Sequence, residues 1–206
     1  MKLTDFDKEL LDMTTIPENV LQILKDAFEL PILQYFGYSE DEMDYVPYDG
    51  ICVNIGMMKY EGHEIRAKVR ELSKALAKEA PDYTAFASEY FIQLEEGEDC
   101  VAIIKTSDWA DPIRAAGIAG FNAQISNQDI IDKLTSWKKD FDIDFKVIYC
   151  DMQQVDLAFL KKPKDIEAFA EEVHDFAPDL VDRLPERETD LITIMNDEDM
   201  FSLYWD

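Results

Sequence analysis

Residues 126–159, SNQDIIDKLTSWKKDFDIDFKVIYCDMQQVDLAF, contain a change in hydrophobic period that indicates a helix followed by two strands. Ser126 with Asp129 three residues later is typical of a helix start, because their side-chain oxygens face the free N–H groups of the first turn. Apolar residues then recur at helical spacing, at Ile130, Leu134, Trp137 and Phe141. From residue 145 the period becomes two, which predicts paired strands over 145–149 and 155–159.

The sequence on either side extends this pattern. A strand is predicted over residues 100–105, a helix begins after Pro163, and a last strand covers residues 201–205. The order from residue 100 is therefore β-α-β-β-α-β, the split βαβ pattern of ferredoxin-like folds. We predict an α+β (mixed α/β) fold with a ferredoxin-like C-terminal domain over 100–206, on which an N-terminal region, 1–99, packs.

The N-terminal region predicts a helix, then a strand, a second helix and a hairpin. Residues 62–79 give the clearest helix, with an apolar stripe at Ile65, Val69, Leu72 and Leu76. Strands are predicted over 51–55 and 89–94, and the second forms a hairpin with the strand that begins at residue 100. Residues 38–49 are acidic, aromatic and turn-rich, and we interpret them as a loop. Whether the strands of both halves form one continuous mixed sheet stays open.

Charge is the dominant feature of the composition, with 45 acidic and 20 basic residues and a net charge of −25. Residues 5–49 hold twelve acids and two lysines, and residues 165–206 hold fourteen acids and two arginines. This field repels phosphates and anionic membranes, so we expect no direct nucleic-acid or membrane binding. The acids either keep the protein in solution or match a basic partner. Halophilic adaptation is disfavoured, because fifteen of the twenty basic residues are lysine.

Other features are typical of a cytoplasmic protein. Charged residues at 5–9 interrupt any apolar signal segment, and no apolar run approaches the roughly 18–20 residues that span a bilayer. Cys52, Cys100 and Cys150 lack C-x-x-C spacing and lie in or beside predicted strands, which favours buried free thiols in a reducing compartment. The sequence does not indicate an oligomeric state.

Catalytic signatures are absent from the sequence. It has no G-x-G-x-x-G, P-loop, G-x-S-x-G, H-E-x-x-H or EF-hand pattern. His63 and His174 lie in predicted helices near charged residues, and we interpret them as exposed helix residues. Acidic pairs such as Asp179 and Asp182 could bind a divalent cation, but 45 acids produce such spacings by chance. The sequence therefore favours a non-enzymatic protein with no cofactor, no metal site and no catalytic residue.

Several C-terminal segments occur in a distinctive order. They are Gly120-Phe121-Asn122, Ser126 followed by Trp137, Phe169-Ala170-Glu171-Glu172-Val173, residues 176–182 (FAPDLVD), and the terminal Leu203-Tyr204-Trp205-Asp206. Over about residues 100–206 this set resembles the bacterial domain-of-unknown-function family 4253. The chain departs from the family pattern at Ala177, where cysteine is expected, and at Tyr204, where tryptophan is expected. The resemblance implies no known activity.

Two functions stand as hypotheses. The first is a non-catalytic acidic interaction or regulatory protein, for example of the immunity type, that binds a basic protein. The second is a small-ligand-binding protein or hydrolase-like enzyme with a cleft formed by segments 107–125 and 176–182. The candidate binding residues are Trp109, Asn122, Asp179, Asp182 and Trp205. A structural role is the alternative for each: Trp205 as a core anchor, Asn122 in a turn, and the aspartates as caps.

Overall fold

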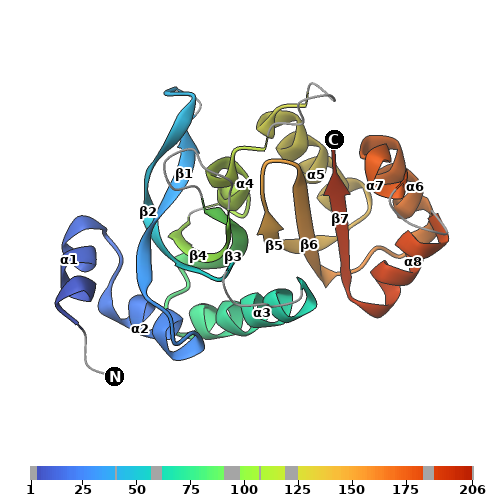
Figure 1. Cartoon of the computed structure of the whole chain (residues 1–206). Coiled ribbons are helices and arrows are strands. Elements are labelled where there is room, and N and C mark those ends of the chain that lie inside the picture. Colours follow the sequence, from blue (N-terminus) through green and yellow to red (C-terminus); the bar gives the residue numbers. More distant parts are fainter. Residues whose placement is uncertain are drawn as a thin grey trace. The chain divides into compact units, whose positions relative to one another are not determined.

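The computed structural model describes residues 4–39, 41–56, 62–90, 98–106, 108–118, 125–182 and 188–205. The chain forms two compact units, Met1–Ala116 and Gly117–Asp206 (Figure 1). Each unit combines antiparallel strand pairs with helices, so the predicted mixed α/β class is confirmed. Among the helices of the described residues, none combines the length and the apolar character that a membrane span requires.

An antiparallel sheet is the frame of the N-terminal unit. Its strands, in spatial order, are β1 (Ile32–Ser39), β2 (Asp44–Asn54), β4 (Glu98–Lys105) and β3 (Tyr83–Tyr90). The long β1–β2 hairpin ends the sheet on the β1 side (Figure 1). β4 lies between β2 and β3, and both of its faces are covered, because consecutive residues from Cys100 to Ile104 are all 0% exposed.

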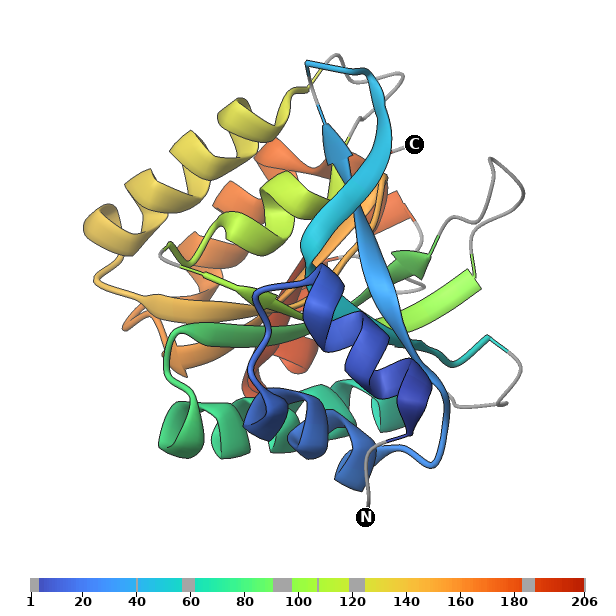
Figure 2. The ribbon, with the colours of Figure 1, turned by 90° about the vertical axis from the view of Figure 1, so that its left-hand side faces the viewer.

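Helices cover both faces of this sheet. They are α1 (Asp5–Met13), α2 (Glu18–Ala27), α3 (Gly62–Glu79) and α4 (Asp111–Ala116). α2 and α3 lie on one face and α4 on the other (Figure 2). The predicted stripe of α3 is buried as expected. Gly37 lets α4 approach β1, since a Cβ at Gly37 would lie 3.0 Å from the Ala115 carbonyl oxygen and 2.7 Å from the Tyr48 ring.

The C-terminal unit contains three antiparallel strands within its described residues. They are β5 (Asp144–Cys150), β6 (Gln154–Lys161) and β7 (Met200–Tyr204), in that order. Its helices are α5 (Asn127–Asp140), α6 (Ile166–Phe176), α7 (Pro178–Asp182) and α8 (Glu188–Asp197). Aromatic rings from α5, α6 and the three strands form its core, with most pairs edge-to-face: Trp137, Phe145, Phe159, Phe169 and Phe201.

The element order from residue 100 is the predicted β-α-β-β-α-β, with additional helices in both connections. The strand pairing, however, differs from the ferredoxin-like one, in which the first strand lies between the third and the fourth. Here the third strand, β6, pairs directly with the fourth, β7, and the first strand, β4, pairs with β2 and β3. β4 uses both of its edges within the N-terminal unit, which an element order cannot reveal.

Three local predictions need correction. The loop predicted over 38–49 is wrong, since most of it belongs to β1 and β2, where Tyr38 and Tyr45 face each other with ring centroids 5.7 Å apart. The strand predicted to begin at 89 begins at Tyr83, which already pairs with Lys105 of β4. Residues 91–94 of that prediction and residues 95–97 of the predicted connection lie outside the described residues. Segment 107–125, predicted as irregular, contains α4.

Candidate functional site

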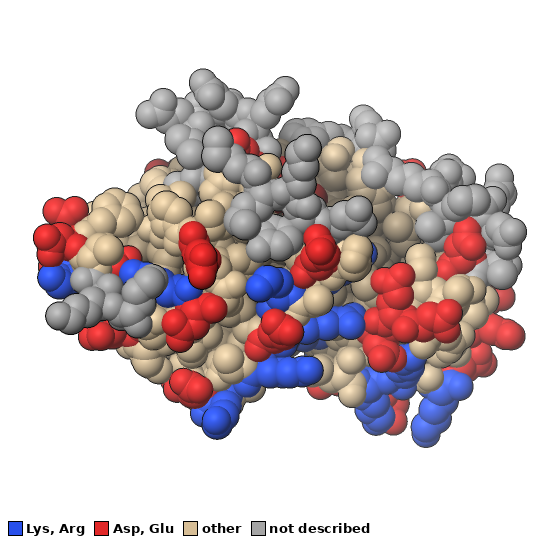
Figure 3. Space-filling model, turned by 60° about the horizontal axis from the view of Figure 1, so that its bottom comes forward, with Lys and Arg blue, Asp and Glu red and all other residues tan. Residues whose placement is uncertain are grey.

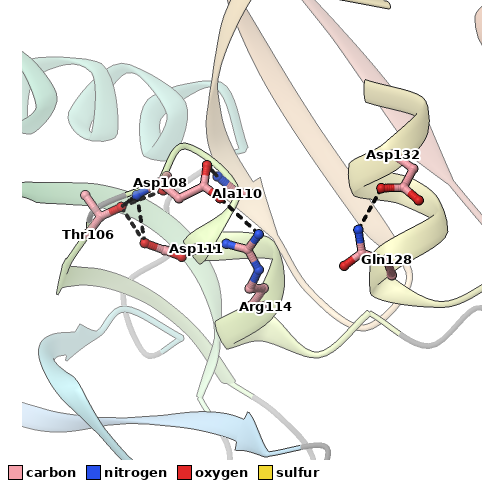
Figure 4. A network of polar contacts seen from close by, with 7 residues as sticks. All are labelled: Thr106, Asp108, Ala110, Asp111, Arg114, Gln128 and Asp132. Carbon is pink, nitrogen blue, oxygen red and sulfur yellow. Dashed lines mark hydrogen bonds and ion pairs between the residues drawn. The ribbon is translucent and has the colours of Figure 1, made fainter. Parts of the chain in front are cut away.

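Trp109, the first predicted binding residue, lies half-exposed in the turn between β4 and α4. Hydrogen bonds fix this turn (Figure 4). The Asp108 backbone N–H donates to Thr106 Oγ1 (3.2 Å) and Asp111 Oδ2 (3.1 Å), and the Thr106 hydroxyl donates to the same carboxylate at 2.9 Å. Asp111 therefore caps the start of α4 and orders the backbone that carries Trp109.

Arg114 forms ion pairs with both carboxylates of this turn. Its guanidinium lies 2.8 Å from Asp111 Oδ1 and 2.9 Å from Asp108 Oδ2. Partial burial would lower the pKa of Arg114, but the hydrogen bonds to Asp108 and Asp111 outweigh it and raise the pKa. Because Asp108 and Asp111 both pair with Arg114, we assign these carboxylates a structural role in holding the turn. Figure 4 also shows a separate bond within α5, from Gln128 to Asp132 (2.7 Å).

Trp205 of the C-terminal unit is buried, with 1% of its surface exposed. Its indole N–H donates to the Phe176 carbonyl oxygen at 3.2 Å, and its ring packs edge-to-face on Phe176 at 5.6 Å. These contacts tie the residue after β7 to the end of α6 and match the core-anchor alternative.

Of the three remaining predicted binding residues, the structure describes the side chain of Asp179 only. Asp179 lies half-buried in the first turn of α7. Asp182 ends the same helix, and its side chain lies outside the described residues, as does the whole of Asn122. Trp109 belongs to the N-terminal unit, whereas Asp179 and Trp205 belong to the C-terminal one. The binding role of the five residues stays a prediction.

The three cysteine thiols, which are the potential nucleophiles, are buried. Cys52, Cys100 and Cys150 are each 0% exposed. Burial is the main cause that raises the pKa of Cys100 and Cys150 well above the usual thiol value. His63 is exposed on α3 and His174 is half-buried on α6. Within the described part of the chain, no group of three or more His, Cys, Asp or Glu side chains is arranged to hold a metal ion.

The N-terminal unit carries many exposed acidic side chains. They lie on α1, on α2 and its flanks, and at the β1–β2 turn. Those that are exposed and form no ion pair with a described residue include Glu9, Asp12, Glu18, Glu29, Asp41 and Glu42. We call these six residues the acidic surface. By contrast, α3 carries both basic and acidic side chains, and Figure 3 shows the two signs mixed on the lower face of the molecule.

A buried ion pair attaches α1, which carries part of the acidic surface. Asp7 is 4% exposed and Lys25 of α2 is 8% exposed, and the two side chains form a hydrogen-bonded salt bridge. Asp7 also accepts hydrogen bonds from the Thr4 backbone N–H (2.6 Å) and the Thr4 hydroxyl (2.7 Å), which completes a capping box. Leu10, which is 1% exposed, completes the inner side of the helix.

The β1–β2 turn presents further acids on a defined backbone. Asp41, Glu42 and Asp44 are exposed around Met43, whose side chain is 80% exposed. Met43 has a φ of 52°, in the left-handed region that costs a non-glycine residue about 1 kcal/mol. The Tyr38–Tyr45 pair packs just below this turn and supports it.

α1 and the turn at Met43 were not predicted from the sequence. A signal for α1 was present, since Thr4 followed by Asp7 has capping-box spacing and precedes Leu10 and Leu11. The turn was not predicted because the strands on either side of it lack the usual alternation of apolar and polar residues. Exposed acids stand at positions where that alternation would place apolar residues.

Both units thus define an acidic mixed α/β protein in which no reactive cluster is assembled among the described residues. The family model described as "Domain of unknown function (DUF4253)" matches residues 100–206, and the chain belongs to this family. The resemblance inferred from the C-terminal segments is therefore confirmed. The match begins within β4, sixteen residues before the N-terminal unit ends at Ala116. Neither a curated protein nor a solved structure matches the chain.

Proposed function

We propose that this chain is a non-catalytic interaction protein that binds a basic partner protein through the acidic surface of its N-terminal unit. The observation that carries the proposal is that these exposed carboxylates have no cation of their own in the described residues. Exposed charges that are not paired internally are available to a partner, and they accelerate association with an oppositely charged surface.

The thiols and the β4–α4 turn support a binding role over catalysis. A nucleophile must reach its substrate as the thiolate, whereas the three cysteines are fully buried and burial keeps the thiols of Cys100 and Cys150 protonated. The carboxylates of Asp108 and Asp111 are held by Arg114 and by backbone N–H groups. Binding through the acidic surface requires neither exposure of the buried thiols nor release of the Asp108 and Asp111 carboxylates from Arg114.

A salt-dependent capture experiment tests the proposal. Immobilised protein is incubated with lysate at about 0.05 M salt and eluted at about 0.5 M, a range over which exposed charge pairs become screened. We expect basic proteins in the eluate, and purified candidates should bind with an affinity that falls steeply with salt. If no captured protein shows this salt dependence, the proposal is wrong.

Matched charge variants locate the binding surface. The first variant carries Glu9→Gln, Asp12→Asn, Glu18→Gln and Glu29→Gln on and beside α1 and α2. The control carries Glu167→Gln, Glu171→Gln, Asp175→Asn and Asp197→Asn on the C-terminal helices, so both variants lose the same charge. We expect the first to slow association with a captured partner by tenfold or more, and the control to have a smaller effect. Equal effects would contradict an N-terminal location.

A thermal-shift screen addresses the competing hypothesis of a ligand site. Metabolites and divalent metals that bind the native state raise the melting temperature in proportion to the logarithm of their concentration. We expect no such shift. A saturating shift with one metabolite class would favour a small-ligand protein instead.

A further inference from the structure

Two large apolar side chains lie exposed on α1 within the acidic surface. Phe6 is 53% exposed and Met13 is 63% exposed, on a short helix whose buried residues are Asp7 and Leu10. Single exposed apolar residues are ordinary on protein surfaces. These two, however, are seven residues apart, which places them two helical turns and about 10 Å apart on the same side of the helix.

Acidic side chains border this pair. Glu9 lies between Phe6 and Met13 along the helix, and Asp5 and Asp12 follow the adjacent row, since residues three and four apart share a helix face. All three acids are exposed, and Lys8 is bonded to Asp5 at 2.8 Å. At the left end of the face in Figure 3, where α1 lies, acidic side chains lie beside basic ones. We call Phe6, Met13, Glu9 and Asp12 the α1 seam.

The seam is held in a fixed position before any partner binds. The Thr4–Asp7 capping box orders the first turn of α1, and the Asp7–Lys25 ion pair and the buried Leu10 attach the adjoining face of the helix to the unit. α1 also packs against β1 (Figure 2). Binding therefore requires no folding of α1, which removes one of the usual entropic costs of association.

We propose that the α1 seam binds one amphipathic, basic helix of the partner protein. Two apolar side chains seven residues apart on that helix pack over Phe6 and Met13, and flanking Lys or Arg side chains face Glu9 and Asp12. This inference rests on the proposed function and specifies its partner. A second copy of this chain is disfavoured as the occupant, because each copy carries a net charge of −25 and the same acids would meet. Anionic lipid surfaces are disfavoured for the same reason.

A designed peptide probes the seam directly. It is a lysine-rich helix with leucines at heptad a and d positions, carries a fluorescent label, and is compared with a scrambled peptide of the same composition. Fluorescence anisotropy is measured at low and at physiological ionic strength. We expect the heptad peptide to bind at least tenfold more tightly than the scrambled one, because only the former aligns apolar side chains with charges on either side.

Paired variants separate the apolar and charged parts of the seam. Phe6→Ala with Met13→Ala is expected to weaken binding of the heptad peptide by about tenfold or more without changing its salt dependence. Glu9→Gln with Asp12→Asn is expected to reduce the affinity and to flatten the salt dependence. Leu160→Ala, which removes an exposed apolar side chain of the C-terminal unit, is the control and should leave binding unchanged.

Each failure has its own pattern. If both peptides bind equally and the Phe6/Met13 variant binds like the wild type, the seam inference is wrong while a basic partner is still supported. If neither peptide binds and the capture experiment also finds no salt-sensitive protein, the proposed function fails with it. A concentration-dependent dimer in ultracentrifugation that the Phe6/Met13 variant abolishes would assign the seam to a second copy and overturn the inference. Circular dichroism of the variants confirms that they fold.

Discussion

The Asp7–Lys25 pair places two charges in the interior of the N-terminal unit. Removing an ion from water costs several kcal/mol, and only a close, hydrogen-bonded partner offsets this. Asp7 has such partners in Lys25 and Thr4, so the pair is stable as a unit and costly to break from one side. α1, and with it the seam, depends on these few contacts.

Replacing Lys25 with Met is therefore expected to lower the free energy of unfolding by about 3 kcal/mol. This is the low end of the range for breaking a buried pair, because α1 can detach and rehydrate Asp7. Urea denaturation measures the loss, and hydrogen exchange of α1 amides should accelerate in the same variant. Lys8→Met, which removes the partner of the exposed Asp5, should change stability by less than about 0.5 kcal/mol. Similar losses for both variants would contradict the assignment.

The same carboxylate predicts a pH dependence. Burial alone would raise the pKa of Asp7, but hydrogen bonds with Lys25 and Thr4 outweigh it and lower the pKa below 3.8. Since the folded state binds this proton less readily than the unfolded state, the stabilisation is complete above pH 3.8 and is lost as the pH falls through the folded-state pKa. Urea midpoints of wild type and Lys25→Met should therefore converge in acid. A constant difference down to low pH would disprove this linkage.

The cysteines give a prediction at the same scale. Cys52, Cys100 and Cys150 are fully buried, so none should react with DTNB in the native protein, and all should react in urea. The native reaction rate should follow the unfolding equilibrium as urea is added. A fast-reacting thiol without denaturant would indicate an accessible nucleophile and would count against the non-catalytic proposal.

Among the elements, helices with a cap and a stripe were the most predictable. Ser126 and Asp129 form the expected capping box, with Ser126 Oγ 2.6 Å from Asp129 Oδ2, and α5 buries Ile130, Leu134 and Trp137 as predicted. The strands of β5 and β6 were also foreseen, because their period of two is local information. Strand partners were not, since pairing joins residues far apart in sequence, as β2 and β4 show.

The candidate site was predictable only in its chemistry. The excess of acids in residues 5–49 was visible in the composition, but the placement of those acids around Phe6 and Met13 depends on where α1 packs. The buried side of α1 carries Leu10 and the ionised Asp7. Hydrophobic patterning would place an aspartate at the surface, so it does not predict which side of α1 is buried. Tertiary pairing with Lys25 overrides that assignment.

The cap of α5 can be tested as an element. Ser126→Ala removes the acceptor of the Asp129 backbone N–H and should lower the free energy of unfolding by about 1 kcal/mol. Thr135→Ala, at an exposed interior position of α5, should instead raise stability by a few tenths of a kcal/mol, because alanine has the higher helix propensity. The urea midpoints of the two variants should therefore move in opposite directions. A shift in the same direction would contradict the role of Ser126.

For the whole molecule, the net charge of −25 means that like charges repel across the folded surface. Raising NaCl from about 0.01 M to about 0.15 M shortens the screening length from about 30 Å to about 8 Å. We expect the melting temperature to rise over this range. Salt screens both the repulsion between exposed acids and the attraction within exposed ion pairs, and in a chain with this net charge the loss of repulsion is the larger effect. Calorimetry at fixed pH measures the change. A melting temperature that falls with salt would show that attractive surface pairs dominate.

The position of β1 at the end of its sheet bears on aggregation. An end strand offers one row of backbone groups to another chain, and this is how cross-β stacking begins. Two features oppose it here: the irregular register between Gln34 and Phe36 bends the strand, and the acids beside Met43 repel a second hairpin. Protonation of those acids would remove the charge repulsion between hairpins. Storage near neutral pH therefore keeps the hairpin protected from fibril growth.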